Sequence, residues 1–481
     1  MHNLWTSYSR KMRSGTVFAA WMPEVNALQA EDFQFGPLVS RAVAAESDNQ
    51  EDQESDDDMD DIDVEWPPNP DNFIDEEWPP RDPLNEIDDP PPPPPPRKRR
   101  PSPSFDDLLA TGKPQTGNHR RRAAKRAKGI QHEGYKPRES TIRDHVLPAE
   151  PVASPAFDAA TLPAAQGAYA AKVESKQEKY GSKKRRTLAE MIALGFQVIH
   201  WNGIDARPLV DSTGRIFAVL AGQPTKEGYP EAVIRAYDFI KTQGTASHFP
   251  AAMCRHRRGL FAAINIGLVY GKGQTAPTWL DNKQHTSLAE SLLSNKDITR
   301  MANFASFAFS LWAPRLHCYY VDYNSRLSPH LRRPFPKSVF ASVAFNFGSN
   351  VWTFKHRDVC NLPYGWCAVQ SLGRFDATKG GHLIFWDLKM VVEFPAGALI
   401  LLPSATIAHS NIPVQDGEER MSFTQFTAGG LFRYIDNGFR TQDKLAAEDP
   451  EEFARLMKLR ESRWQDGLAL FSTLDELLPD D

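Results

Sequence analysis

The chain has 481 residues, of which 41% are hydrophobic and 24% charged, and its formal net charge at pH 7 is -5. Its longest apolar stretch, around Val391 to Ala408, is interrupted by Glu393, Pro395 and Pro403, so we expect no membrane-spanning helix. The four cysteines form no Cys-x-x-Cys pair, which argues against a disulfide scaffold and fits a reducing compartment.

Residues 1–186 have the composition of a largely disordered arm. Residues 46–90 contain 20 Asp or Glu against one Arg, a net charge of -19, and prolines fill positions 90–96. Such segments bury too little apolar surface to offset the entropy of ordering. Basic groups at 97–100, 120–128 and 183–186 are typical of nuclear import signals or nucleic-acid-binding tails. We therefore expect a nuclear protein that uses the import machinery, with an organelle presequence or merely solvated charge as the alternatives.

From Thr187 the pattern becomes globular and predicts an α+β domain over residues 187–441 with a dominant antiparallel barrel. A helical tail follows over 442–481, where Phe453, Leu456 and Leu459 have helical spacing. The predicted elements in chain order are a capped helix over 187–195, a strand over 196–201, a hairpin over 208–220, helices over 231–242 and within 288–311, and a series of strands over 338–432.

Two residues at strand spacing are the first candidate ligands of a metal ion. Side chains at i and i+2 leave the same face of a strand, so His356 and Asp358 can reach one ion. The apolar run Ala398–Pro403 predicts a buried strand that leads to His409, a third ligand. Two histidines with one carboxylate form the facial set that leaves positions open on non-haem Fe(II).

Other interpretations of these residues exist. His356 and Asp358 could be a surface pair, and His382 could replace His409 as a ligand, although a lone histidine in an apolar strand is usually a packing residue. A zinc site built from Cys254, His256, His317 and Cys318 would need a spacing unlike the usual fingers.

A cation lies on the strand that follows the turn Asp416–Gly417. Arg420 and Ser422 share one face of this predicted strand. A guanidinium beside a hydroxyl suits a carboxylate, because it offers directional, charge-assisted hydrogen bonds. The far carboxylate of 2-oxoglutarate is such a group.

The charge of the predicted domain indicates a polyanionic partner. Residues 187–441 contain 25 Lys or Arg and 18 Asp or Glu, a net charge of +7. Arg332 and Arg333, together with the cluster at 255–258, precede the metal-ligand strands and are candidates to contact phosphates of DNA or RNA.

These motifs resemble the TET/JBP-like branch of the Fe(II)/2-oxoglutarate dioxygenases, and look closest to fungal members often found with Kyakuja-Dileera-Zisupton transposons. The resemblance rests on His356-x-Asp358-x-x-Asn361, Gly380-Gly381-His382, His409 and Arg420-x-Ser422, and covers about residues 187–441. It implies a double-stranded β-helix (jelly-roll) core with flanking helices. It also implies Fe(II) held by His356, Asp358 and His409, and 2-oxoglutarate held by Arg420 and Ser422.

The activity implied by the resemblance is hydroxylation of a methyl group on a base such as 5-methylcytosine. Consumption of O2 and decarboxylation of 2-oxoglutarate to succinate would accompany it, and Asn361 would contact the flipped base. TET enzymes carry a base-contacting histidine soon after Arg-x-Ser, whereas residues 423–428 here contain none. That departure permits one alternative, an oxygenase for a protein or small molecule. A second alternative is a catalytically inactive, transposon-associated nucleic-acid-binding module.

Overall fold

The computed structural model describes residues 7–11, 17–21, 117–174, 183–225, 228–271, 273–327 and 331–478. The chain divides into two units, Met1–Asp63 and Val64–Asp481. In the first unit the described residues form an antiparallel hairpin of β1 (Ser7–Lys11) and β2 (Val17–Trp21). The predicted acidic block 46–90, the proline run and the basic group 97–100 lie outside the described residues.

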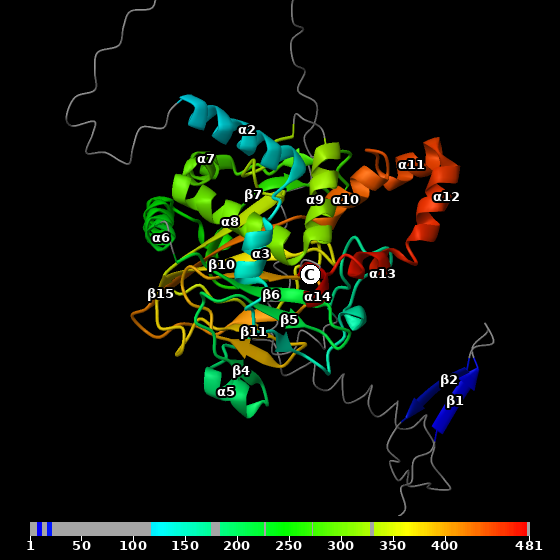
Figure 1. Ribbon diagram of the computed structural model, residues 1–481, viewed down its shortest axis with the longest axis horizontal. Helices are drawn as coiled ribbons and strands as arrows, with labels where there is room; N and C mark the ends of the chain where they lie inside the picture. Colours follow the sequence, from blue (N-terminus) through cyan, green and yellow to red (C-terminus); the bar gives the residue numbers. More distant parts are fainter. Residues whose placement is uncertain are drawn as a thin grey trace, which may run out of the picture. The chain divides into compact units, whose positions relative to one another are not determined.

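A nine-stranded sheet crosses the second unit (Figure 1). In order across the sheet, its strands are β3 (Val152–Ala153), β5 (Arg207–Val210), β6 (Ile216–Gly222), β13 (Leu399–Leu402), β10 (Cys367–Arg374), β15 (Glu419–Phe426), β9 (Ser342–Phe347), β7 (Ala262–Val269) and β8 (Thr278–Trp279). Neighbours are antiparallel except β3 with β5. All four residues of β13 are fully buried, as the apolar run in the sequence predicts.

A smaller sheet carries one of the predicted metal ligands at its edge. Its order is β14 (His409–Asn411), β11 (Leu383–Phe385), β12 (Met390–Val392) and β4 (Gln197–Ile199). The main hydrophobic cluster contains Leu383 and Val392 of this sheet together with Ile400 and Leu402 of β13. The two sheets therefore share one core.

Helices cover the outer faces of both sheets (Figure 1). A second cluster packs Val233 of α6 and Met301 of α8 on Phe345 and Phe423 of the large sheet. Next to the small sheet, Met191 of α5 packs on the outward-facing side chains of β11 and β12. The bounds are α5 (Leu188–Ala193), α6 (Tyr229–Ala246), η5 (Ala251–Cys254), η6 (Lys283–His285), α7 (Thr286–Ser294), α8 (Lys296–Trp312) and α9 (Pro314–Arg326).

The segment 117–174 differs from the expected disordered arm, because it has regular structure and contributes to the core. It contains α2 (Gly117–Glu133), α3 (Glu139–His145), β3 and η4 (Ala159–Thr161). Val152, Ala159 and Leu162 are buried in the main cluster. Its apolar residues are too few and too irregularly spaced to reveal this from the sequence, since they are buried only against distant parts of the chain.

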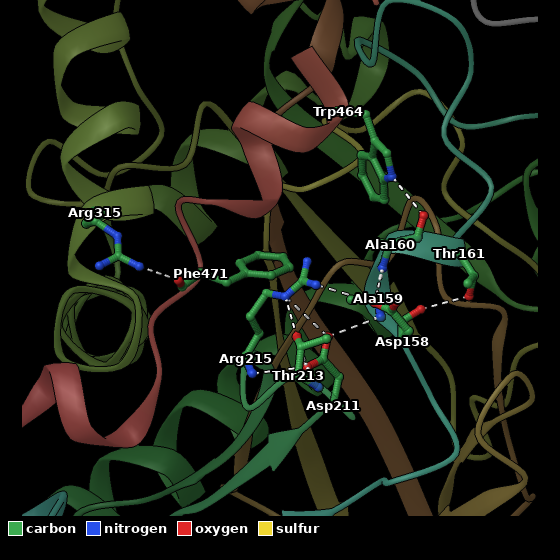
Figure 2. Close-up of polar contacts among 10 residues, drawn as sticks. All are labelled: Asp158, Ala159, Ala160, Thr161, Asp211, Thr213, Arg215, Arg315, Trp464 and Phe471. Atoms are coloured by element: carbon green, nitrogen blue, oxygen red, sulfur yellow. Dashed lines mark hydrogen bonds and ion pairs between the residues drawn. The ribbon is translucent and has the colours of Figure 1, made fainter. Parts of the chain in front are cut away.

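The C-terminal residues form helices and contact the 117–174 segment as well as distant parts of the second unit. Helices there are α10 (Gly429–Asp436), α11 (Gln442–Glu448), α12 (Pro450–Leu459), α13 (Arg463–Leu468) and α14 (Leu474–Leu477). Figure 2 shows that the Trp464 indole Nε1 donates to the Ala160 carbonyl (3.0 Å), while the Arg315 guanidinium donates to the Phe471 carbonyl. The Ile216 amide also donates to Ser472 O (2.8 Å). The tail thus joins the N-terminal segment to α9 and the β5–β6 hairpin.

Most of the predicted elements between 187 and 312 are present. Thr187 and Glu190 form a reciprocal capping box on α5, and the predicted hairpin is β5–β6. The sequence did not indicate α9, and it predicted strand where α10 begins. No helix in the described part of the chain is both long and apolar enough to cross a membrane.

Candidate metal centre

His356 and His409 are brought together by backbone pairing between two segments far apart in the sequence. The His356 amide donates to the His409 carbonyl (3.0 Å), and the His409 amide donates to the His356 carbonyl (2.9 Å). His409 is the first residue of β14, and His356 lies in the segment after β9. This reciprocal pairing sets the two imidazole rings 4.3 Å apart between their centroids.

Asp358 completes a compact set of three ligand atoms. Its Oδ1 lies 3.9 Å from His356 Nε2, and its Oδ2 lies 4.0 Å from His409 Nε2. All three ligand atoms lie within 4.8 Å of one another, and in the described residues this is the one group of His, Cys, Asp or Glu placed to hold a metal ion. In the described residues, the four residues of the alternative zinc site do not form a group that could hold a metal ion: Cys254, His256, His317 and Cys318.

Local hydrogen bonds orient both imidazoles with Nε2 toward Asp358. His356 Nδ1 is 2.8 Å from Phe354 O, and His409 Nδ1 is 2.9 Å from Ile407 O. A carbonyl can only accept, so each Nδ1 carries the proton and each Nε2 presents a lone pair. Metal-binding histidines commonly make such a hydrogen bond with the ring nitrogen that does not face the metal.

The electrostatics favour the forms that bind metal. Burial lowers the pKa of both His356 and His409, which keeps the imidazoles neutral. Burial alone would raise the pKa of Asp358, but the positive charges around it, among them the permanent cations Arg257 and Arg258, outweigh burial and hold the pKa well below its usual range. Two neutral imidazoles and a carboxylate anion are the protonation states in which such ligands bind a divalent ion.

Arg257 touches the centre directly. Its Nη2 donates to Asp358 Oδ1 (3.2 Å), and its Nη1 donates to Arg357 O (2.9 Å). The sequence placed this residue only within a cluster of candidate phosphate contacts. Arg257 precedes its two partners by 100 and 101 positions, so no local pattern could indicate these contacts.

Arg420 is a deeply buried cation with unused donors. Its side chain is among the largest fully buried ones, and the residue is 1% exposed. Nη1 donates to Val351 O (2.8 Å), whereas Nε and Nη2 have no partner in the described residues. Burial lowers the pKa of Arg420 to about 10. Because unpaired buried donors on a charged group are costly, this guanidinium fits an anionic ligand.

The ring of Phe394 lies 5.9 Å from the Arg420 guanidinium, and hydroxyl groups lie on β15 and the neighbouring β10. Ser422 follows on the same face of β15, and its Oγ accepts from Asn346 Nδ2 (2.8 Å). Ser371 lies opposite Ser422 in the β10–β15 register, and its buried Oγ has no partner in the described part of the chain. Together these residues offer an anionic ligand a cation and hydroxyl groups.

Asn361 lies close to the metal ligands. Its backbone N–H donates to Asp358 O (2.8 Å), and its side-chain Nδ2 donates to Ser404 Oγ (3.2 Å). The backbone of Ser404 in turn accepts from the Asp358 amide (2.9 Å). Asn361 as a whole is half-buried.

Arg332 and Arg333 are not brought to the centre by their described contacts. Arg332 pairs with Glu290 of α7 and stacks on Trp279 at 4.1 Å. Arg333 donates to the carbonyls of Ser338 (2.7 Å) and Gln131 (3.0 Å). Arg333 thereby contacts the end of α2.

His382 lies directly before β11 and is not among the metal-ligand group of the described residues. It is fully buried. Burial lowers the pKa of His382 to about 4, and Glu393 and His200 also act on it. The structure therefore favours His409 over His382 as the histidine beside Asp358.

No protein-family model and no curated protein matches the chain. Similar solved structures include NgTET1 in complex with 5mC DNA, at 13% identity and a TM-score of 0.36, covering 53% of this chain and 92% of that one. Another is a 2OG-Fe(II) oxygenase family oxidoreductase from Burkholderia pseudomallei, at 19% identity and a TM-score of 0.21, covering 35% and 67%. A third is the collagen prolyl hydroxylase vCPH of Paramecium Bursaria Chlorella virus-1, at 16% identity and a TM-score of 0.15, covering 18% and 57%. Because these values are low, we base function on the site geometry.

Proposed function

We propose that this chain is an Fe(II)- and 2-oxoglutarate-dependent dioxygenase of the TET/JBP-like type. The observation that carries the proposal is the convergence of His356, Asp358 and His409, with a buried, partly unpaired Arg420 on the adjoining large sheet. Three protein ligands leave coordination positions for a chelating keto acid and O2. Arg420, held in a fixed position, would bind the far carboxylate of 2-oxoglutarate and so give that molecule one orientation.

The strand order supports a double-stranded β-helix core. Four neighbours in the large sheet are β13, β10, β15 and β9, and three in the small sheet are β12, β11 and β14. The His356 bridge to His409 adds a fourth segment beside β14. Eight segments divided between two facing sheets, four in each, are the pattern of a jelly roll.

Each residue has a separate task in the proposed reaction. When bound, Fe(II) would supply the redox chemistry that couples 2-oxoglutarate decarboxylation to substrate hydroxylation, with one oxygen atom of O2 in succinate and the other in the product. Arg420 and Ser422 would hold the far carboxylate through charge-assisted hydrogen bonds. Arg257 would hold Asp358 through its 3.2 Å contact and keep that carboxylate facing the histidines.

For the substrate we infer a methylated base in DNA or RNA, acted on in the nucleus. The exposed surface of α2 supports this choice. It carries Arg121, Arg122, Lys125, Arg126 and Lys128, all exposed, and none of them takes part in an ion pair within the described residues. An open pocket of about 530 Å³ is lined by Arg122 and Arg126 with Lys337. Unpaired cations along a helix suit a phosphate backbone.

The activity is tested by incubating the full chain with Fe(II), 2-oxoglutarate and methylated oligonucleotides, and then measuring succinate and modified nucleosides by mass spectrometry. His356→Ala and Asp358→Ala should abolish stoichiometric Fe(II) binding and succinate formation, because two ligands cannot hold the ion in facial geometry. Full iron occupancy in a variant that carries both His356→Ala and Asp358→Ala would refute the assignment of the metal site. Succinate with no change in any nucleoside would favour a protein or small-molecule substrate. Metal and nucleic-acid binding without turnover would favour the inactive binding module.

The nucleic-acid partner has a separate test in the salt dependence of binding. Changing Arg121, Arg122, Lys125 and Arg126 to Gln should weaken binding to all sequences and flatten the slope of log affinity against log salt, by about 0.9 for each lost duplex contact. The control changes Arg235, Arg374, Lys379 and Arg455, which are exposed but paired with acids. Asn361→Ala should lower product formation and leave the slope unchanged. Equal slopes in the α2 variant and the control would remove α2 as the phosphate-binding surface.

A further inference from the structure

Arg357 lies between two of the proposed metal ligands, yet its side chain leaves the opposite face of the chain. All three guanidinium nitrogens are engaged: Nε donates to Thr406 O (2.9 Å), Nη1 to Glu174 Oε1 (2.7 Å) and Nη2 to Asp387 Oδ1 (2.6 Å). The side chain is only 10% exposed. A guanidinium with three partners has one allowed position, so it restricts the backbone on either side of it.

Asp387 extends this contact to the segment that bears His409. Its Oδ2 accepts from the Ala408 amide (2.6 Å), directly before His409. The neighbouring Trp386 amide donates to Ala408 O (2.9 Å). One carboxylate therefore joins the backbone next to His409 to the side chain between His356 and Asp358.

Glu174 adds a third segment, from outside the predicted catalytic domain. Its side chain is 8% exposed. The chain just before it is attached to the same place, since the Ala171 amide donates to Val359 O (2.8 Å), one residue after Asp358. A buried carboxylate needs a compensating charge, and Arg357 provides it.

We propose that Arg357, Asp387 and Glu174 form a positioning clamp that holds the three metal ligands in register from the side opposite the ion. The proposal rests on the metal centre of the proposed function and deepens it. The clamp touches neither metal nor substrate. It ties residues 356–358 to residues 408–409, and so sets the spacing between Asp358 and the two histidines. Residues 171–174, which the sequence assigns to a disordered arm, thereby become part of the centre.

The clamp is tested by metal binding, with Co(II) as the probe because its visible absorption reports coordination geometry. In the full chain, Arg357→Ala and Asp387→Asn should each weaken Co(II) binding by about 10- to 100-fold, the usual effect of removing residues that orient metal ligands, and should alter the Co(II) spectrum. Glu174→Gln should act in the same direction. Arg357→Lys keeps the charge but loses the planar fork, so it should recover only part of the affinity.

The control is Arg374→Ala, which removes an exposed pair with Asp238 and should leave Co(II) affinity and spectrum unchanged. Because the clamp would act as one unit, Arg357→Ala with Asp387→Asn should cost less than the sum of the two single changes. If Arg357→Ala does not fold, Arg357→Lys and Asp387→Asn decide the question. Folded variants with wild-type Co(II) affinity and spectrum would overturn the clamp and leave the proposed function standing. A wild-type chain that binds no Co(II) would overturn both.

Discussion

At the scale of single residues, the centre depends on which hydrogen-bonding atoms are satisfied. The two histidines each use Nδ1 on a carbonyl of their own segment, which leaves Nε2 for a metal. Arg420 is the opposite case, because it is buried with Nε and Nη2 unpaired. The two free Nε2 atoms mark where a metal ion would bind. The unpaired donors of Arg420 mark where a carboxylate would bind.

Arg420→Ala should weaken 2-oxoglutarate binding by about 2 to 4 kcal/mol, roughly 30- to 1000-fold, because a charge-assisted pair in a desolvated pocket is lost. Co(II) binding should stay unchanged, since Arg420 is not a ligand. Calorimetric titration of 2-oxoglutarate into the Co(II)-loaded chain measures the effect, with Arg374→Ala as the control. Arg420→Lys should recover part of the loss. An unchanged affinity would move the carboxylate anchor to another residue.

At the scale of elements, β15 shows how one strand serves both the core and the site. Arg420 and Ser422 lie on one face, whereas Met421 and Phe423 lie on the other and pack in the cluster under α6 and α8. Strand alternation makes this division predictable from the sequence. The start of α10 was not predictable, because it depends on close contact with distant segments. A Cβ on Gly429 would lie 1.9 Å from the Tyr169 carbonyl oxygen, and one on Gly430 would lie 2.4 Å from that of Tyr270.

Gly429→Ala should therefore lower the free energy of unfolding by about 1 to 3 kcal/mol, the usual cost of overpacking. Chemical denaturation followed by circular dichroism measures it. The matched control is Gly129→Ala in α2, where an added Cβ meets nothing within 4 Å. That change should be neutral or stabilising by up to about 1 kcal/mol, because alanine is the better helix former. A neutral Gly429→Ala would show that residues near Tyr169 do not pack here in solution.

At the scale of the whole molecule, the described histidines make stability depend on pH. His317 is 1% exposed, and burial lowers its pKa to about 3; His382 is fully buried with its pKa lowered to about 4. In the unfolded chain both have a pKa near 6.5, so between that value and the folded pKa only the unfolded state takes up their protons. Their contribution to stability is complete above about pH 6.5 and falls as the pH decreases.

The free energy of unfolding should thus decrease as the pH is lowered from 7 to 5, by up to about 1.4 kcal/mol per pH unit for each such histidine below its unfolded pKa. Denaturation at several pH values measures the slope. His317→Leu removes one titrating group from an apolar site and should make the slope shallower by that amount. Parallel slopes for wild type and His317→Leu would contradict the buried, neutral state of His317.

The sequence by itself determined the local features of this protein. Capping residues define α5, an apolar run defines β13, and strand alternation places Arg420 with Ser422 on β15. These features depend on periodicity and on neighbouring side chains, which a single stretch of sequence contains.

Only the tertiary structure decided which distant residues complete each feature. It joined His409 to His356, brought Arg257 to Asp358, and attached Glu174 and Asp387 to Arg357. It also placed Val152 and Leu162 in the core and engaged Arg333 with the carbonyl of Gln131. These contacts join residues far apart in the chain. The burial that makes them favourable comes from the packed sheets and not from any local pattern, so no periodicity could reveal them.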